Sequence, residues 1–323
     1  MSAVNEVSPV FHAGELEVQE RAGVRERIGA LGPRFIRDRL PDQHREFFAH
    51  LPTLLVGSID AQQRLWASVL FGAPGFVQAS DERHLTVHAL PGEGDPLRAR
   101  LVAGTPLGLL GIEPHSRRRN RLNGTVTGVT AQGFTVEVDQ SFGNCPQYIQ
   151  ARVPQFVREA RVPAQVQQHG TSLTASASAL VARADTFFIA TAAAHAAGHA
   201  GAHGVDVSHR GGKPGFVRVT EKDGQALLLA PDFRGNSLFN TLGNIAANPR
   251  AGLLFIDYDR GDLLQITGAA EIVWDGPDLA SFVGAHRLLR VAVASSGWHA
   301  AALPLRWSAP QQAPQLAATG AWR

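Results

Sequence analysis

The chain contains few residues of several types, and each shortage excludes some classes of protein. Cys145 is the one cysteine among 323 residues, so no disulfide can form within the chain, and a reducing cytoplasm is the expected compartment. No apolar run reaches the ~18 residues that a membrane-spanning helix needs. Residues 1–20 have neither a positively charged start nor an apolar centre, so we expect no secretory signal there. These shortages predict a cytoplasmic protein that does not cross a membrane.

Lysine is also scarce, since Lys213 and Lys222 are the only two and arginine supplies the rest of the positive charge. The formal net charge is only +2, and the one basic run lies at 117–121. That run has no interleaved aromatic residues and no second basic stripe beside it, which argues against nucleic acid as a partner. An anionic small molecule fits so local a cluster better, and a solvated loop is the plainer alternative.

What the chain does contain is an internal repeat. Six residues recur at an offset of 140, and five more recur at an offset of 144. The first set is Ser68, Gly72, Pro74, Gly75, Phe76 and Val77, which match Ser208, Gly212, Pro214, Gly215, Phe216 and Val217. The second set is Gly108, Leu109, Leu110, Ile112 and Gly124, which match Gly252, Leu253, Leu254, Ile256 and Gly268. The chain is therefore interpreted as two copies of one unit.

Each copy reads as many short strands punctuated by Gly, Pro and Asp, with one inserted helix, at 95–103 in the first copy and 236–247 in the second. This pattern predicts a mainly β fold of two tandem small barrels, not a doubly wound sheet. Apolar spacing predicts two further helices at 15–31 and 42–50. We expect an N-terminal helical segment at 1–52, barrel domains at 53–161 and 176–308, and a C-terminal tail at 309–323.

The second copy carries a candidate anion site at the start of its helix. Asn236 is a strong N-cap type, and the first turn of a helix offers unpaired N–H groups and partial positive charge. Arg234 adds a planar fork suited to phosphate, and Asn240 and Thr241 follow one turn later. The first copy has Glu93, Gly94 and Asp95 where the second has Arg234, Gly235 and Asn236. Because carboxylates repel phosphate, we expect one site, in the second copy; an ordinary capped helix is the alternative.

The segment 206–218 is the other half of this hypothesis. As a strand it would place Asp206 and Ser208 on one side and Val207 and His209 on the other. The two glycines at 211–212 would let backbone amides approach a flat ligand. We therefore expect 206–218 to form a hairpin beside the ligand, and a hairpin turn without a ligand is the alternative.

Five segments together resemble the flavin-nucleotide-binding branch of the pyridoxamine-phosphate-oxidase-like proteins, the FMN-binding split barrels. They are 11–15 (FHAGE), 118–124 (RRNRLNG), 142–149 (FGNCPQYI), 208–212 (SHRGG), and 233–236 (FRGN) through the Asn-Pro pair at 248–249. The oxidase's own Ser-Arg-Lys phosphate triplet is absent, and 239–241 (FNT) stands at the corresponding distance. The resemblance therefore implies FMN without implying pyridoxamine-phosphate oxidation.

The resemblance implies a six-stranded split barrel per copy, with FMN in a cleft between them. Its phosphate would meet Arg234, Asn236, Asn240 and Thr241, and its ring would lie against a strand pair at 207–210 and 216–218. The first barrel would act as a built-in partner, making an intrachain pseudo-dimer, and a homodimer stays open. The residues expected at the cofactor are Asp206, Val207, Ser208, His209, Arg210, Lys213, Phe216, Arg218, Phe233, Arg234, Asn236, Asn240, Thr241, Arg119 and Arg121.

The activity implied is that of an FMN-dependent oxidoreductase acting on an unknown small molecule. The alternative is a binding module that holds flavin, haem or a deazaflavin without turnover. His195, His199 and His203 are spaced four apart, as metal ligands on a helix would be, but the Ala- and Gly-rich stretch at 193–204 favours a loop. Cys145 is either a small buried residue or a thiol near the flavin.

Overall fold

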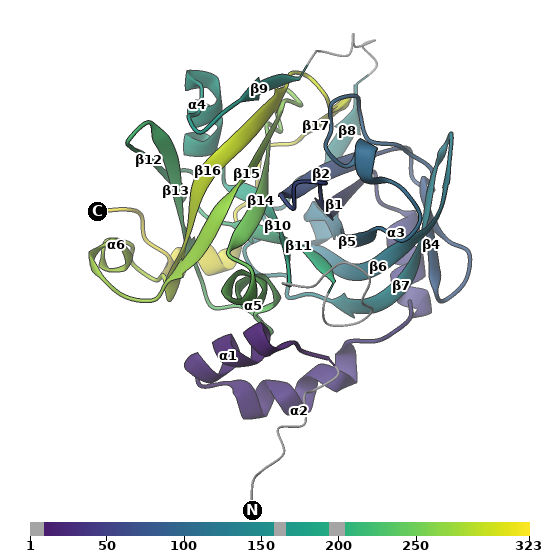
Figure 1. Cartoon of the computed structure of the whole chain (residues 1–323), viewed down its shortest axis with the longest axis horizontal. Coiled ribbons are helices and arrows are strands. Elements are labelled where there is room, and N and C mark those ends of the chain that lie inside the picture. The colour runs from purple at the N-terminus through teal and green to yellow at the C-terminus, as the bar shows by residue number, and fades with distance from the viewer. Residues whose placement is uncertain (1–9, 158–165, 194–203) are drawn as a thin grey trace, which may run out of the picture.

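The computed structural model describes residues 10–157, 166–193 and 204–323 (Figure 1). The fold is mainly β, as the sequence predicted, and is built on two large antiparallel sheets. The first sheet contains β1 (Thr53–Ile59), β2 (Leu65–Phe71), β3 (Val77–Ala79), β4 (His84–Val87), β5 (Pro106–Glu113), β6 (Arg118–Thr130) and β7 (Gly133–Gly143). The second contains β10 (Thr186–Ala192), β11 (Val205–Gly211), β12 (Arg218–Lys222), β13 (Gln225–Asp232), β14 (Arg250–Ile256), β15 (Leu263–Val273) and β16 (Arg287–His299).

Both sheets follow one strand order. It is β2-β1-β5-β6-β7-β4-β3 in the first sheet and β11-β10-β14-β15-β16-β13-β12 in the second, where β9 (Gln167–His169) adds to β16. Each strand of the first sheet thus has a counterpart at the same position of the second sheet, with a label higher by nine, as β1 and β10 have. A small third sheet pairs β8 (Pro154–Phe156) with β17 (Leu305–Trp307). The internal repeat of the sequence is therefore a repeat of topology.

Repeated glycines mark places where the backbone leaves no room for a side chain. The ladder shifts register immediately before Gly124 in the first sheet and before Gly268 in the second. A Cβ at Gly124 would lie 2.1 Å from the carbonyl oxygen of Glu137, and one at Gly268 would lie 2.0 Å from that of Ala292. The same bulge therefore requires glycine in both copies.

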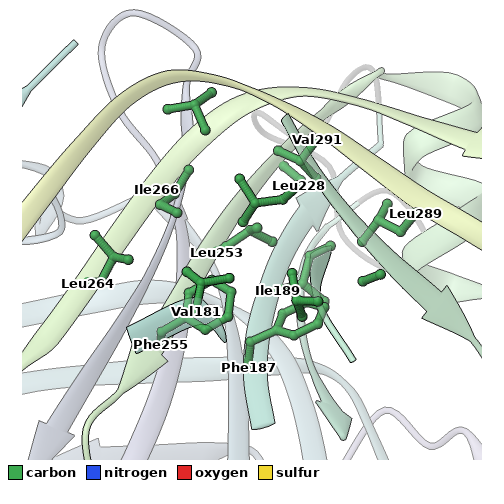
Figure 2. Packing of buried hydrophobic residues seen from close by; sticks show 14 of the residues in the cluster. Val181, Phe187, Ile189, Leu228, Leu253, Phe255, Leu264, Ile266, Leu289 and Val291 are labelled. Atoms are coloured by element: carbon green, nitrogen blue, oxygen red, sulfur yellow. The ribbon is translucent and has the colours of Figure 1, made fainter. Parts of the chain in front are cut away.

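The sheets pack against each other through equivalent strands. Each has its own apolar core, and Figure 2 shows that of the second sheet around Phe187, Leu253 and Ile266. A third cluster joins the two halves, with Leu55 and Leu110 from the first sheet against residues of the second that include Val207. Strand β5 lies against β11, and β14 lies against β2.

The N-terminal segment forms α1 (Ala13–Arg21), α2 (Arg25–Phe35) and α3 (Asp42–Ala49). The single helix expected at 15–31 is wrong, because the chain turns at Gly23 with φ of 68° and divides it in two. Helix α1 packs on α5 (Asn240–Ala247), beside the second sheet (Figure 1). In the described part of the chain, no helix is both long and apolar enough to cross a membrane.

The inserted helices differ from their predicted bounds. In the first copy, 95–103 forms only one 3-10 turn, η1 (Arg98–Arg100), while η2 (Pro114–Ser116) precedes β6. In the second copy the helix expected from 236 begins at Asn240, because Ser237 and Phe239 adopt left-handed backbone angles that no α-helix contains. Helices α4 (Ala175–Arg183) and α6 (Pro277–Ala280) were not predicted.

The segment 206–218 is not a hairpin. Strand β11 pairs with β10, and β12 pairs with β13, so the two strands lie at opposite ends of the sheet order. The expected strand pair for a flavin ring is therefore wrong. The C-terminal segment at 309–323 contains η4 (Pro314–Ala318), and its Gln311 and Trp322 form backbone bridges to Ala151 and Phe282.

Candidate functional site: a basic cleft between the two sheets

A cleft opens where β6 of the first sheet faces β11 and the start of α5. Its cavity volume is about 90 Å³, and the cleft is open to solvent at its mouth. The first half supplies Arg119, Arg121, Asn144, Cys145, Gln147 and Tyr148 to its wall. The second half supplies Ser208, His209, Arg210, Gly211, Pro231, Asp232, Phe233, Gly235, Asn236, Ser237, Phe239, Asn240, Thr241 and Leu242.

Arg121 is the most deeply buried charge of the cleft, at 3% exposure. It forms an ion pair with Asp206, and its Nη1 donates to Oδ1 of Asn240 at 3.1 Å. Asp206 also accepts from Nδ2 of Asn123 at 2.8 Å and from Nδ2 of Asn244 at 2.7 Å. Within the described residues, Nε of Arg121 meets no hydrogen-bond partner. One donor of this buried cluster is thus left unsatisfied within the described chain.

Arg119 lies beside it on the same face of β6. Its Nε donates to the carbonyl oxygen of Cys145 at 2.7 Å, and its Nη1 donates to Nδ1 of His209 at 3.1 Å. Burial lowers the pKa of Arg119 to about 10; Cys145 acts to raise this pKa, and Arg210 and Arg121 act to lower it. Its guanidinium still carries a proton at neutral pH.

His209 is held neutral by this setting. Burial, followed by the charges of Arg119 and Arg210, holds its pKa well below the usual value. A guanidinium only donates, so Nδ1 of the neutral ring must accept and Nε2 must carry the proton. His209 therefore contributes an N–H donor at Nε2 and no positive charge.

Arg210 and Arg287 share one carboxylate. Asp232 lies 3.7 Å from Nη1 of Arg210 and 2.9 Å from Nη2 of Arg287. Three arginines of the cleft wall, with Arg287 behind Asp232, thus lie near two carboxylates, Asp206 and Asp232. The third nearby acid, Glu15, is neutral at pH 7, since burial and then the charge of Asp206 raise its pKa to about 8. The cleft retains unbalanced positive charge, which suits an anionic ligand.

The start of α5 adds donors to this wall. Its N-cap residue, Phe239, has φ of 62° and makes no side-chain cap, so the first turn keeps its N–H groups and partial positive charge. Thr241 donates from Oγ1 to Oγ of Ser208 at 3.1 Å. Asn236 does not cap the helix; its Oδ1 accepts from the backbone of Leu238, and its Nδ2 donates to Asn144 at 2.9 Å.

Nine of the fifteen residues expected at the cofactor line this cleft, and six do not. The nine are Arg119, Arg121, Ser208, His209, Arg210, Phe233, Asn236, Asn240 and Thr241. Asp206 lies behind Arg121 as its ion partner, Val207 packs between the sheets, and Phe216 belongs to the core of the second sheet. Lys213 and Arg218 contact the C-terminal segment instead, through the carbonyl of Thr319 and the ring of Trp322.

Arg234, the arginine on which the sequence hypothesis centred, is an exposed loop residue and is absent from the cleft wall. The helix begins six residues after it, so Arg234 does not stand directly before the first turn. Its backbone carbonyl accepts from the hydroxyl of Tyr148 at 3.2 Å. The positive charge that was expected from Arg234 comes instead from Arg119, Arg121 and Arg210.

Several residues of the site were missed from the sequence. Arg287 lies on β16, a strand that was not predicted. Tyr148 stacks on Phe233 with ring centres 5.1 Å apart, joining the two halves beside the cleft, and its place in the family-like segment 142–149 was the only signal. Cys145 is half-buried on the wall, not enclosed in a core. His195, His199 and His203 lie outside the described residues.

The equivalent place in the first sheet is closed by other residues. Ser68, the counterpart of Ser208, donates to Oδ1 of Asp95 at 2.7 Å, and Gln265 donates to Oδ2 of Asp95 at 3.2 Å. Asp95 thus stands where Thr241 stands in the second copy, not where Asn236 does. At the repeat offset of 144, Arg121 and Arg119 become Gln265 and Leu263. Only the cleft of the second copy combines arginines with an uncapped helix start, within the described ranges.

The fold is mainly β, and the cleft lies between its two halves. Residues 173–303 match the family model described as pyridoxamine 5'-phosphate oxidase. The match spans the second sheet and confirms the resemblance to the pyridoxamine 5'-phosphate oxidase-like proteins for this part of the chain.

Solved structures similar to parts of the chain have low identity. HupZ of Group A Streptococcus is 15% identical, with 38% of this chain and 90% of that chain covered and a TM-score of 0.28. A FAD-binding protein of Mesorhizobium loti is 16% identical, with 42% and 99% covered and a TM-score of 0.25. HutZ, the heme storage protein of Vibrio cholerae, is 12% identical, with 34% and 81% covered and a TM-score of 0.22. No curated protein matches the sequence.

Proposed function

We propose that this chain binds FMN in the basic cleft and acts as an FMN-dependent oxidoreductase on a small molecule. The observation that carries the proposal is the meeting of Arg119, Arg121 and Arg210 at the uncapped start of α5. Their charge exceeds that of the carboxylates beside them, and a phosphate would balance it. The match of residues 173–303 to the family model described as pyridoxamine 5'-phosphate oxidase supports a flavin nucleotide as the source of that phosphate.

The residues present fit such a group. Nε of Arg121 is a buried donor without a partner in the described chain, and Arg119 and Arg210 offer further guanidinium donors at the same wall. These arginines, with Thr241 and the first N–H groups of α5, would hold the phosphate. Tyr148 and Phe233 offer aromatic faces beside which a planar ring would lie. Bound flavin supplies the redox chemistry, and the protein orients it and sets its electrostatic surroundings.

The tautomer of His209 favours flavin over haem. An axial haem ligand needs a free lone pair on a ring nitrogen. Here Nδ1 accepts from Arg119, and Nε2 carries the proton. His209 can therefore donate a hydrogen bond from Nε2, which an acceptor atom of a flavin ring would accept. It offers no free lone pair to ligate iron.

The two halves would work as an intrachain pseudo-dimer. Arg119 and Arg121 come from the first sheet, whereas the rest of the basic wall comes from the second. The repeated strand order and the packing of β5 on β11 and β14 on β2 support this arrangement. On this proposal, 53–161 and 176–308 are the two barrel domains, and neither holds the cofactor alone.

The proposal is tested by adding FMN and haem separately to the purified full chain and recording absorbance after gel filtration. We expect flavin absorbance to stay with the protein and haem absorbance not to. A protein that retains no FMN would contradict the proposal. Reduction of the bound flavin by a nicotinamide, followed in the absence of oxygen, then separates an oxidoreductase from a module that binds flavin without turnover.

A further inference from the structure

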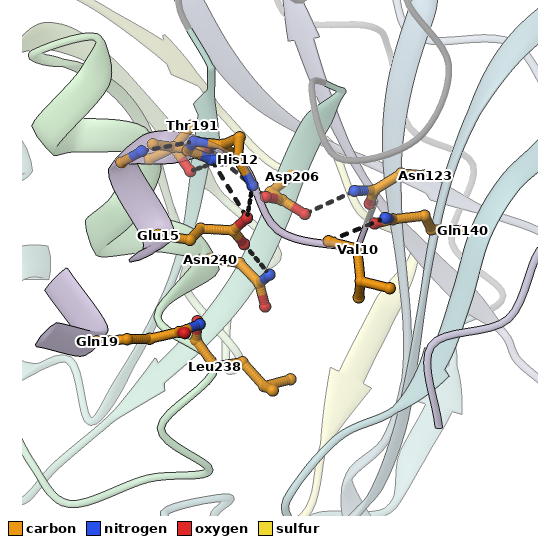
Figure 3. A network of polar contacts seen from close by, with 12 residues as sticks. Val10, His12, Glu15, Gln19, Asn123, Gln140, Thr191, Asp206, Leu238 and Asn240 are labelled. Atoms are coloured by element: carbon orange, nitrogen blue, oxygen red, sulfur yellow. Dashed lines mark hydrogen bonds and ion pairs between the residues drawn. The ribbon is translucent and has the colours of Figure 1, made fainter. Parts of the chain in front are cut away.

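The N-terminal helix reaches the wall of the ligand cleft. Helix α1 crosses α5 where Gly14 faces Gly243, and a Cβ at Gly14 would lie 2.3 Å from the carbonyl oxygen of Gly243. This close crossing places Glu15, 2% exposed, against Asn240 at the first turn of α5 (Figure 3). Oε2 of Glu15 accepts from the backbone of His12 at 2.9 Å, which closes a capping box.

Asn240 connects Glu15 to Arg121. Its Nδ2 donates to Oε1 of Glu15, and its Oδ1 accepts from Nη1 of Arg121 at 3.1 Å. A side-chain amide has one donor end and one acceptor end. The acceptor at Glu15 therefore fixes which end faces Arg121. Without it the amide could turn and present its NH₂ group to a guanidinium, leaving two donors facing each other.

We propose that Glu15 is a positioning residue of the ligand cleft: by orienting Asn240 it holds Arg121 for the anionic group of the ligand. The inference rests on the proposed function in one respect, that Arg121 meets that anionic group. It assigns to the N-terminal helix a part in a site that otherwise belongs to the two sheets.

The charges around Glu15 make this role sensitive to pH. The groups that face it are His12 at the start of its own helix, Asp206 from β11 and Arg121 from β6. Burial, and then Asp206, raise the pKa of Glu15 to about 8, so it is neutral at pH 7. Above that pH a negative charge forms beside Arg121 and offsets part of its attraction for an anion. Affinity for an anionic ligand should fall between pH 7 and 9, where a phosphomonoester, with a second pKa near 6, does not titrate.

The test titrates the full chain and three variants with FMN between pH 7 and 9. We expect E15A to raise Kd roughly tenfold or more, since the amide of Asn240 loses its acceptor. E15Q keeps an oxygen for Asn240 and should stay within about threefold of the parent at pH 7. Its Kd should not change with pH, whereas that of the parent rises severalfold. E17A, at an exposed glutamate of the same helix, should behave as the parent.

Sulfate, whose charge is constant over this range, is titrated in parallel by thermal shift, so the two proposals can fail separately. If E15A and E17A bind FMN equally well, the positioning role is overturned and FMN binding stands. If the parent binds sulfate but not FMN, the proposed function falls, and the same variants decide the positioning role with sulfate. If it binds neither, both are overturned. Should circular dichroism show E15A unfolded, E15Q decides: a Kd raised tenfold or more at pH 7, in a variant that keeps the oxygen for Asn240, would overturn the positioning role.

Discussion

Among the arginines of the cleft, Arg119 has no carboxylate partner within the described residues. Arg121 pairs with Asp206, and Arg210 and Arg287 share Asp232. Within the described residues, Arg119 donates to the backbone carbonyls of Cys145 and His209 and to the ring of His209. Its charge is therefore the one most available to a ligand and the one whose loss disturbs the folded protein least.

We expect R119Q to weaken FMN binding by about 10- to 100-fold, because a charge-assisted hydrogen bond contributes roughly 1.5–3 kcal/mol. Its Tm should change little, since no buried carboxylate is left without a partner. R234Q is the matched control: the exposed loop arginine should alter Kd less than about twofold. Fluorescence titration of both variants checks this, and a larger loss in R234Q than in R119Q would return the anion site to the loop at 233–236.

Glu15 should also make the free energy of unfolding depend on pH. Its pKa rises from 4.5 to about 8 on folding, mainly through burial, so the folded state binds a proton that the unfolded state has released. The stabilisation is complete below pH 4.5 and is lost as the pH rises to about 8. We expect the free energy of unfolding of the parent to fall by a few kcal/mol across this window relative to E15Q, which cannot ionise there. Urea unfolding at pH 5, 6.5 and 8 measures the difference; parallel curves would contradict the raised pKa.

At the scale of elements, the crossing of α1 over α5 depends on two glycines. A Cβ at Gly243 would lie 2.5 Å from Cα of Glu15, which is backbone and cannot swing aside. G243A should therefore separate the helices, destabilise the protein by about 1–3 kcal/mol and weaken ligand binding with it. The control is G29A, at a helical glycine of α2 with no atom within 4 Å of its Cβ, which should stabilise the chain by about 0.5–1 kcal/mol. The denaturant midpoints of both variants measure these changes in stability. An unchanged midpoint for G243A would show that the packing of α1 on α5 does not require glycine at 243.

The strands were predictable from the sequence because period and punctuation are local properties. The repeat of Gly124 as Gly268 reported a bulge that the structure shows twice. The start of α5 was not predictable in the same way: Asn236 has the side chain of an N-cap, but two left-handed residues after it postpone the helix to Asn240. The chain there is shaped by the segment 142–149 and by α1, which lie far away in the sequence.

The site was predicted in its residue types more than in its geometry. The sequence predicted an anion site at Arg234 because this arginine lies two residues before Asn236, the expected N-cap of the helix. The structure instead gathers Arg119, Arg121 and Arg210 from two different sheets, and such a meeting depends on pairing between distant strands. The resemblance suggested Arg119 and Arg121 as the contribution of the first half, and both line the cleft.

At the scale of the whole molecule, the repeat has two equivalent positions but one basic cleft. At the other position Ser68, Asp95 and Gln265 bond to one another, burial raises the pKa of Asp95, and Leu263 stands in place of Arg119. A phosphate there would meet an acid and an apolar side chain where the cleft offers arginines.

We therefore expect one FMN per 34.5 kDa chain, with no second, weaker equivalent. A protein made of two identical barrels would bind two, since symmetry gives it two equal sites. Isothermal titration of the full chain measures the number directly, and R119Q should lower the affinity of that single equivalent without revealing another. D95N is the matched change at the first position: it should leave the count at one, because removing one acid supplies no arginine. A count of two would mean that the first position also binds FMN, although Leu263 and Gln265 stand there in place of Arg119 and Arg121.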